Sequence, residues 1–109
     1  MKARQFIIAK CYDKRGQLLS VGVNSYTKTH PLQAYFAKKV GHSERQFLHA
    51  EIQAILRAKD KQIYRITIER YDRNGNPALA APCPVCVEAI KAYNIQIIEH
   101  TQSLQNQLF

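Results

Sequence analysis

The stretch that decides the fold is LHAEIQAILRAKDKQIYRITIER, residues 48–70. Its first part spaces apolar residues three and four apart, which predicts an amphipathic helix over residues 48–60. Its second part alternates apolar and polar side chains, which predicts a half-exposed strand over residues 63–70. A helix that runs directly into a strand is typical of an α/β fold with right-handed parallel crossovers.

The flanking segments continue this succession of strands and helices. Residues 6–12 and 17–23 are rich in β-prone residues and are separated by a turn ending in glycine, which predicts a β-hairpin. Residues 83–93 predict a second helix, and residues 95–100 a short last strand. We therefore expect an α/β fold with a mixed four-stranded sheet in the order β-β-α-β-α-β and both helices on one face.

Two further segments have less regular patterns. Residues 24–46 form a long polar connection, within which residues 32–39 fit one or two helical turns. Residues 43–46 fit a capping box, which would start the following helix earlier. Near the end of the chain, Leu104 and Leu108 have the spacing of a short helix.

Length and composition predict one folded domain over residues 1–109. Hydrophobic residues make up 46% of the 109, enough for one modest core. No apolar run exceeds four residues, so we expect no membrane partner. The net charge of +8 indicates an anionic partner such as a nucleotide or nucleic acid, or else a basic surface that only aids solubility.

The three cysteines indicate a metal or redox site. Their odd number, without a recognisable secretory signal, predicts a reducing cytoplasm. Cys83 and Cys86 have C-x-x-C spacing at a predicted helix start, where the helix dipole favours thiolates. His49 can add a third ligand from another segment, and three protein ligands with one open position are typical of catalytic zinc.

Other interpretations of the cysteine pair remain open. The pair could be redox-active, although no thioredoxin-like pattern precedes it. It could also be half of a structural zinc site, which needs a fourth protein ligand. The candidates for that ligand are Cys11, His30, His42 and His100.

Two short motifs lie about 30 residues apart: His49-Ala50-Glu51 is H-x-E, and residues 82–86, PCPVC, are P-C-x-x-C. This pair is the signature of zinc-dependent nucleobase deaminases. Over residues 6–100 the chain resembles the cytidine deaminase superfamily, whose α/β fold has two or three layers. Residues 24–31 are similar to small deaminase-like proteins encoded by bacteriophages.

The motif also predicts where the site lies in the fold. Positions two apart within a helix point about 200° away from each other, so His49 and Glu51 can face one metal only where a helix begins. We therefore expect the metal at the amino ends of both helices, beside the carboxyl ends of the parallel strands.

The resemblance implies a role for each residue of the motifs. Zinc would be the cofactor, bound by His49, Cys83 and Cys86, with Glu51 as general acid and base. Substrate contacts would come from Asn24 and from backbone groups at Ala50 and Pro82. Tyr26, His30 and Phe47 are candidates to stack on the base.

The expected substrate is cytosine in a free nucleoside or nucleotide, converted to uracil and ammonia. One alternative is a deaminase that edits single-stranded DNA or RNA, which the positive charge favours. Another is a catalytically silent zinc module that binds nucleic acid or protein.

The sequence departs from the superfamily at its first strand. Superfamily members usually have a helix before this strand, on the sheet face opposite the catalytic helices, whereas here the strand begins almost at once. That face, with Arg65, Thr67 and Glu69, should be thinly covered. Because superfamily members are often dimers or tetramers, we expect a homo-oligomer.

Overall fold

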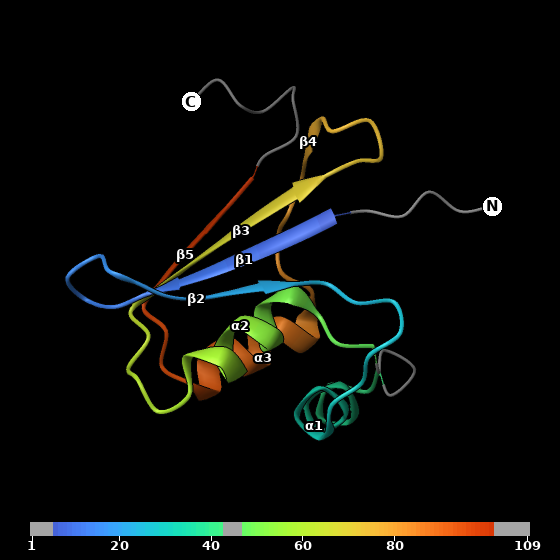
Figure 1. Cartoon of the computed structure of the whole chain (residues 1–109). Helices are drawn as coiled ribbons and strands as arrows, with labels where there is room; N and C mark the ends of the chain where they lie inside the picture. Colours follow the sequence, from blue (N-terminus) through green and yellow to red (C-terminus); the bar gives the residue numbers. More distant parts are fainter. Residues whose placement is uncertain (1–5, 43–46, 102–109) are drawn as a thin grey trace.

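The structure is a computed structural model that describes residues 6–42 and 47–101 (Figure 1). Its elements in chain order are β1 (Phe6–Tyr12), β2 (Leu18–Val23), α1 (Pro31–Lys39), α2 (Ala50–Ala58), β3 (Arg65–Tyr71), β4 (Pro77–Ala78), α3 (Pro84–Ala92) and β5 (Ile97–His100). The α/β class is confirmed. The capping box at residues 43–46 and the tail with Leu104 and Leu108 lie outside the described residues.

The sheet is mixed, with β1 at its centre between β2 and β3. β1 is antiparallel to both neighbours, so β2 and β3 run in the same direction and α2 connects them. Along its other edge, β3 pairs in parallel with β5 and, at Arg70 and Tyr71, antiparallel with β4. The expectation of four strands was wrong, because the sheet has five. The strand that was missed is β4, whose two residues are too few to show alternation.

All three helices lie on one side of the sheet, as Figure 1 shows. The core between them and the sheet contains Ala9 and Cys11 of β1, Ile66 and Ile68 of β3, and the apolar side of α2. On the other side of β3, Arg65, Thr67 and Glu69 are only half-buried. Alternation along β3 therefore separates a buried side from a wetter one.

A close approach fixes α2 against β2. A Cβ on Gly22 would lie 2.3 Å from the Ala50 carbonyl oxygen, so only glycine fits there without a shift. The Ser20 hydroxyl donates to the Ala54 carbonyl (2.6 Å), and the Gln53 side-chain oxygen accepts from the Val23 amide (2.8 Å). These contacts hold the amino end of α2 at the end of the sheet.

α1 has nine residues and begins one residue before the helical turns expected over 32–39. Its first turn is capped by His30, whose Nδ1 accepts from the Leu32 amide at 3.0 Å. Near its end, Lys39 forms an ion pair with Glu88 of α3. None of the helices in the described part of the chain is long and apolar enough to cross a bilayer.

Candidate metal centre

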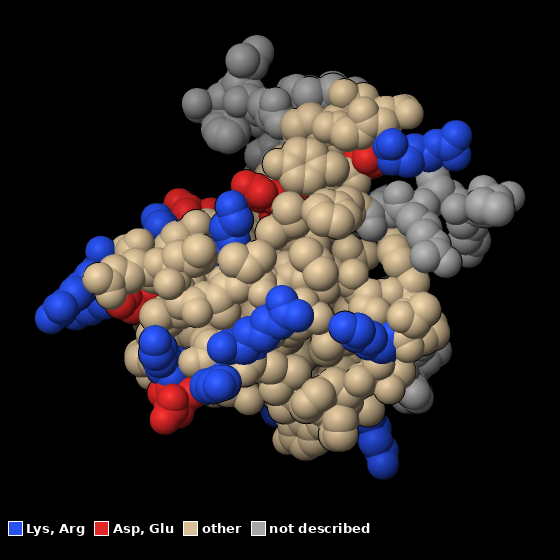
Figure 2. All heavy atoms as spheres, in the orientation of Figure 1, with Lys and Arg blue, Asp and Glu red and all other residues tan. Residues whose placement is uncertain are grey.

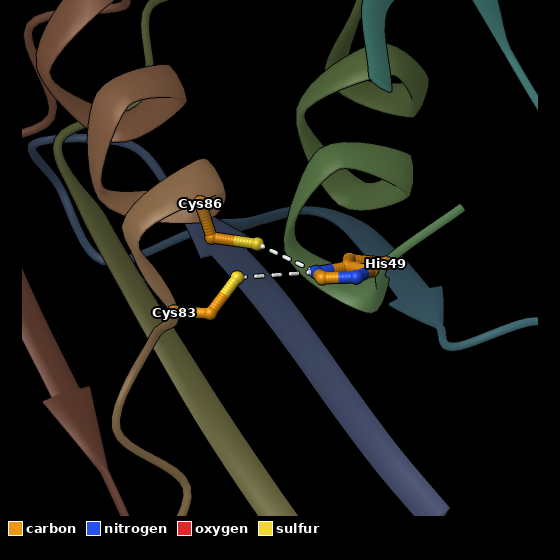
Figure 3. A group of neighbouring side chains, drawn as sticks. All are labelled: His49, Cys83 and Cys86. Carbon is orange, nitrogen blue, oxygen red and sulfur yellow. Dashed lines mark hydrogen bonds between the residues drawn. The ribbon is translucent and has the colours of Figure 1, made fainter. Parts of the chain in front are cut away.

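The amino ends of α2 and α3 bring the three candidate ligands together. His49 immediately precedes α2, Cys83 immediately precedes α3, and Cys86 lies in the first turn of α3. In Figure 3 the three side chains converge between the two helix ends. His49 Nδ1 lies 3.2 Å from Cys86 Sγ and 3.4 Å from Cys83 Sγ.

These distances suit a divalent metal ion. The ligand atoms all lie within 4.8 Å of one another, close enough to hold one ion. Tetrahedral zinc with a nitrogen at about 2.05 Å and a sulfur at about 2.3 Å separates those two atoms by roughly 3.6 Å. The two observed nitrogen–sulfur distances fall slightly below this value, so the donor set is compatible with zinc.

None of the candidate fourth ligands in the described residues belongs to this group. Cys11 is fully buried in the core, and burial raises the pKa of its thiol to about 11. His30 caps α1, and His100 Nδ1 lies 3.2 Å from the Thr101 carbonyl oxygen. A group of three protein ligands matches the donor count of catalytic zinc better than that of structural zinc.

The two thiols differ in how readily they ionise. A hydrogen bond with the Cys86 thiol lowers the pKa of Cys83 to about 3, and His49 adds to this effect. The same bond, together with burial, raises the pKa of Cys86 well above its usual value. Cys83 is therefore the more acidic thiol of the pair, and thiolates are the form in which cysteines bind metals.

Glu51 lies beside this group as the second residue of α2. Its side chain is only 5% exposed, and burial raises the pKa of its carboxyl. A carboxyl in such a site can hold a proton at a higher pH than one in water. The arrangement therefore places a buried carboxyl group next to the three candidate ligand side chains.

A cavity of about 410 Å³ opens beside the cluster, and both His49 and Glu51 line it. Part of its lining comes from Asn24, Ser25 and Tyr26, which follow β2, and from Phe47. The remaining lining residues are Ile7, Ile68, Arg70, Ala80, Ala81 and Cys83. A largely apolar cavity with a few polar groups is the usual form of a small-molecule site.

The predicted substrate residues occupy different positions. Asn24 lines the cavity, but its Oδ1 accepts from the Ile7 amide at 2.9 Å and so also joins the ends of β1 and β2. Ala50 is fully buried and Pro82 is half-buried, and neither lines the cavity.

Of the three candidate stacking residues, Tyr26 and Phe47 line the cavity and are exposed by 42% and 52%. His30 is not among the lining residues.

The sequence interpretation missed two residues. Gln33 of α1 is fully buried, and its Oε1 accepts from the His49 amide at 3.1 Å, which positions a metal ligand. Arg70 lines the cavity. A signal for Arg70 was present, because alternation places this charged residue on the same side of the strand as Ile66 and Ile68.

Comparison with known proteins adds no relative, since neither a family model nor a curated protein matches the chain.

Proposed function

We propose that the protein is a zinc-dependent hydrolase that removes the amino group of a nucleobase, with cytosine in a free nucleoside or nucleotide as substrate. One observation carries the proposal: two members of the metal cluster, His49 and Cys83, line the same cavity as the buried Glu51. A metal, a proton carrier and room for a ligand are what hydrolytic deamination needs.

The residues divide the chemistry between them. Zinc held by His49, Cys83 and Cys86 would supply an activated water by lowering its pKa. Glu51 would accept the proton of that water and deliver it to the ring nitrogen and then to the departing amine. Water adds to the amino-bearing carbon, its C–N bond breaks, and the products are the keto base and ammonia.

The cavity suits a flat heteroaromatic ring. Its mouth carries Tyr26 and Phe47, whose exposed rings offer surfaces on which a base can stack. Asn24 lines the same cavity, where its amide would contact the base or sugar. Ala50 and Pro82, the residues first expected to hold the base, contribute no lining surface, and they are left out of the proposed substrate contacts.

A second candidate substrate is cytosine or adenine within a single-stranded polynucleotide. The observation that favours it is the net charge of +8. Figure 2 shows basic side chains spread over the visible face with few acidic ones between them. Phosphate contacts to such a surface would make affinity fall steeply with salt.

The test combines metal analysis with a substrate panel. Purified protein should carry one zinc per chain and release ammonia from at least one of cytidine, deoxycytidine, their monophosphates and a cytosine-containing oligonucleotide. Glu51→Gln should keep zinc and lose about 10²- to 10⁴-fold in turnover. The control Glu88→Gln removes a carboxylate outside the cavity, from the ion pair with Lys39, and should leave turnover unchanged.

Zinc without turnover on any member of the panel would reject the deaminase proposal. Equal turnover by Glu51→Gln and the unmodified protein would reject the role of Glu51. Zinc binding without turnover, whether or not Glu51 is replaced, would support the alternative of a catalytically silent zinc module.

A further inference from the structure

Arg70 brings a cation into the proposed catalytic cavity. It lies near the end of β3, half-buried, and is the one lysine or arginine among the lining residues in ranges 6–42 and 47–101. Its Nη1 donates to the carbonyl oxygen of Leu79, just after β4, at 3.1 Å. This bond holds the plane of the guanidinium group against the β3–β4 hairpin.

The other edge of the same guanidinium group has no partner in the described part of the chain. Nε is buried and makes no hydrogen bond. Across residues 6–42 and 47–101, no carboxylate forms an ion pair with Arg70. Native proteins seldom leave a buried charged donor unsatisfied, because nothing replaces its lost hydration.

An oxyanion in the cavity would pair with the remaining N–H donors of this guanidinium group. A guanidinium group presents parallel N–H donors that match two oxygens of a phosphate or carboxylate. Among the described residues that line the cavity, Glu51 is the only carboxylate, and it is needed for proton transfer in the proposed mechanism. A ligand that spans the cavity from the metal cluster to Arg70 would therefore be a base at one end and an anion at the other.

We propose that Arg70 binds a phosphate group of the substrate, so that the substrate is a nucleotide or a nucleotide unit rather than a nucleoside. This inference rests on the proposed function, which supplies the base at the metal end. The phosphate is either that of a free monophosphate or a phosphodiester next to the target base in a single strand. The chemistry at Arg70 is the same in both.

Binding of products measures this contact without turnover. The probes are uridine, uridine 5′-monophosphate and an oligodeoxynucleotide with one deoxyuridine, titrated into zinc-loaded protein at fixed salt. A charge-assisted contact should make the monophosphate or the oligonucleotide bind about 10- to 100-fold tighter than uridine. The phosphate-bearing probe that shows this gain identifies the source of the phosphate.

Two variants of Arg70 and a matched control separate anion binding from folding. Arg70→Gln should remove most of the gain while leaving uridine affinity unchanged. Arg70→Lys keeps the charge but loses the paired donors, so it should retain only part of the gain. The control Arg57→Gln removes an arginine that also donates Nη1 to a backbone carbonyl, that of Val21 at 3.0 Å, but does not line the cavity; it should retain the full gain.

Three results would overturn the inference. The first is equal affinity of the unmodified protein for all three probes. The second is an Arg70→Gln variant whose affinity for uridine falls by the same factor as its affinity for the phosphate-bearing probe, because Arg70 would then only hold the hairpin. The third applies if Arg70→Gln does not fold: inorganic phosphate that fails to displace the phosphate-bearing probe from the unmodified protein.

Failure of the deaminase proposal has a different outcome. An Arg70-dependent preference for phosphate without ammonia release from any substrate would support the anion site and reject the deaminase. Turnover of cytidine with no preference for phosphate would reject the anion site and support the deaminase.

Discussion

Replacing Gly22 with alanine tests how far the metal centre depends on the packing of α2 against β2. The added Cβ would lie 2.3 Å from the Ala50 carbonyl oxygen and 2.5 Å from the Ala54 amide nitrogen. Both are backbone atoms and cannot rotate away. Ordinary contact begins at 3.4 Å, so α2 must retreat from β2 by about 1 Å at its closest point. His49 and Glu51 flank Ala50 and would move with it.

That movement of α2 should weaken zinc binding as well as reduce the free energy of unfolding. Cys83 and Cys86 lie at the start of α3, so a displaced α2 carries His49 away from both sulfurs, which now lie 3.4 and 3.2 Å from its Nδ1. We expect zinc affinity to fall about 10- to 100-fold, as when the support of a metal ligand is lost. Overpacking should also reduce the free energy of unfolding by about 1–3 kcal/mol.

The assay is competition for zinc with a chromophoric chelator, followed by urea unfolding of the zinc-free protein. Gly16→Ala is the matched control, because it adds the same methyl group where nothing lies within 4 Å. At its φ of +86° alanine is strained, so this control should lose about 1–2 kcal/mol of stability but no zinc affinity. Gly22→Ala with the zinc affinity of the unmodified protein would refute the reasoning.

Three further predictions follow from the same contacts. In zinc-free protein, iodoacetamide should modify Cys83 at pH 6 as fast as at pH 8, because its pKa of about 3 keeps the thiol ionised at both. Cys11, with a pKa of about 11, should stay unmodified. Peptide mass mapping measures both rates, and a Cys83 rate that rises with pH contradicts the assignment. Gln33→Leu removes the acceptor of the His49 amide and should lower the free energy of unfolding, measured in urea, by about 1–3 kcal/mol. An unchanged free energy of unfolding would show that this hydrogen bond does not stabilise the fold. Zinc at 100 times its dissociation constant should raise the free energy of unfolding by about 2.7 kcal/mol. At the same zinc concentration, the free energy of unfolding of Cys83→Ser should rise by less. Equal increases for the two proteins would place the zinc elsewhere.

The sequence predicted most of the elements. β1 has the bounds expected from its β-prone composition. α2 lies within the range predicted from its apolar spacing, and α3 within the range predicted to open at the prolines. α1 begins one residue before the expected range of 32–39. Its buried face includes Gln33, which a polarity pattern assigns to solvent. β4 has two residues, which pair only because β3 extends far enough to meet them.

The candidate site was predictable where the chemistry lies in short motifs. H-x-E and P-C-x-x-C identified His49, Cys83 and Cys86, and the geometry of helix starts located them at the amino ends of α2 and α3. Arg70 was not predicted, because its position depends on a hairpin that brings Leu79 across the end of β3. Alternation placed its side chain on the same side of β3 as Ile66 and Ile68, but only the folded structure shows that a cavity lies there.

X-ray absorption at the zinc edge of the purified protein tests the central claim most directly. A single ion held by His49, Cys83 and Cys86 with one position open to solvent should show two sulfur neighbours at about 2.3 Å and two nitrogen or oxygen neighbours at about 2.0 Å. Protein purified without zinc, or a zinc ion with no sulfur neighbour or with three or more, would contradict the account.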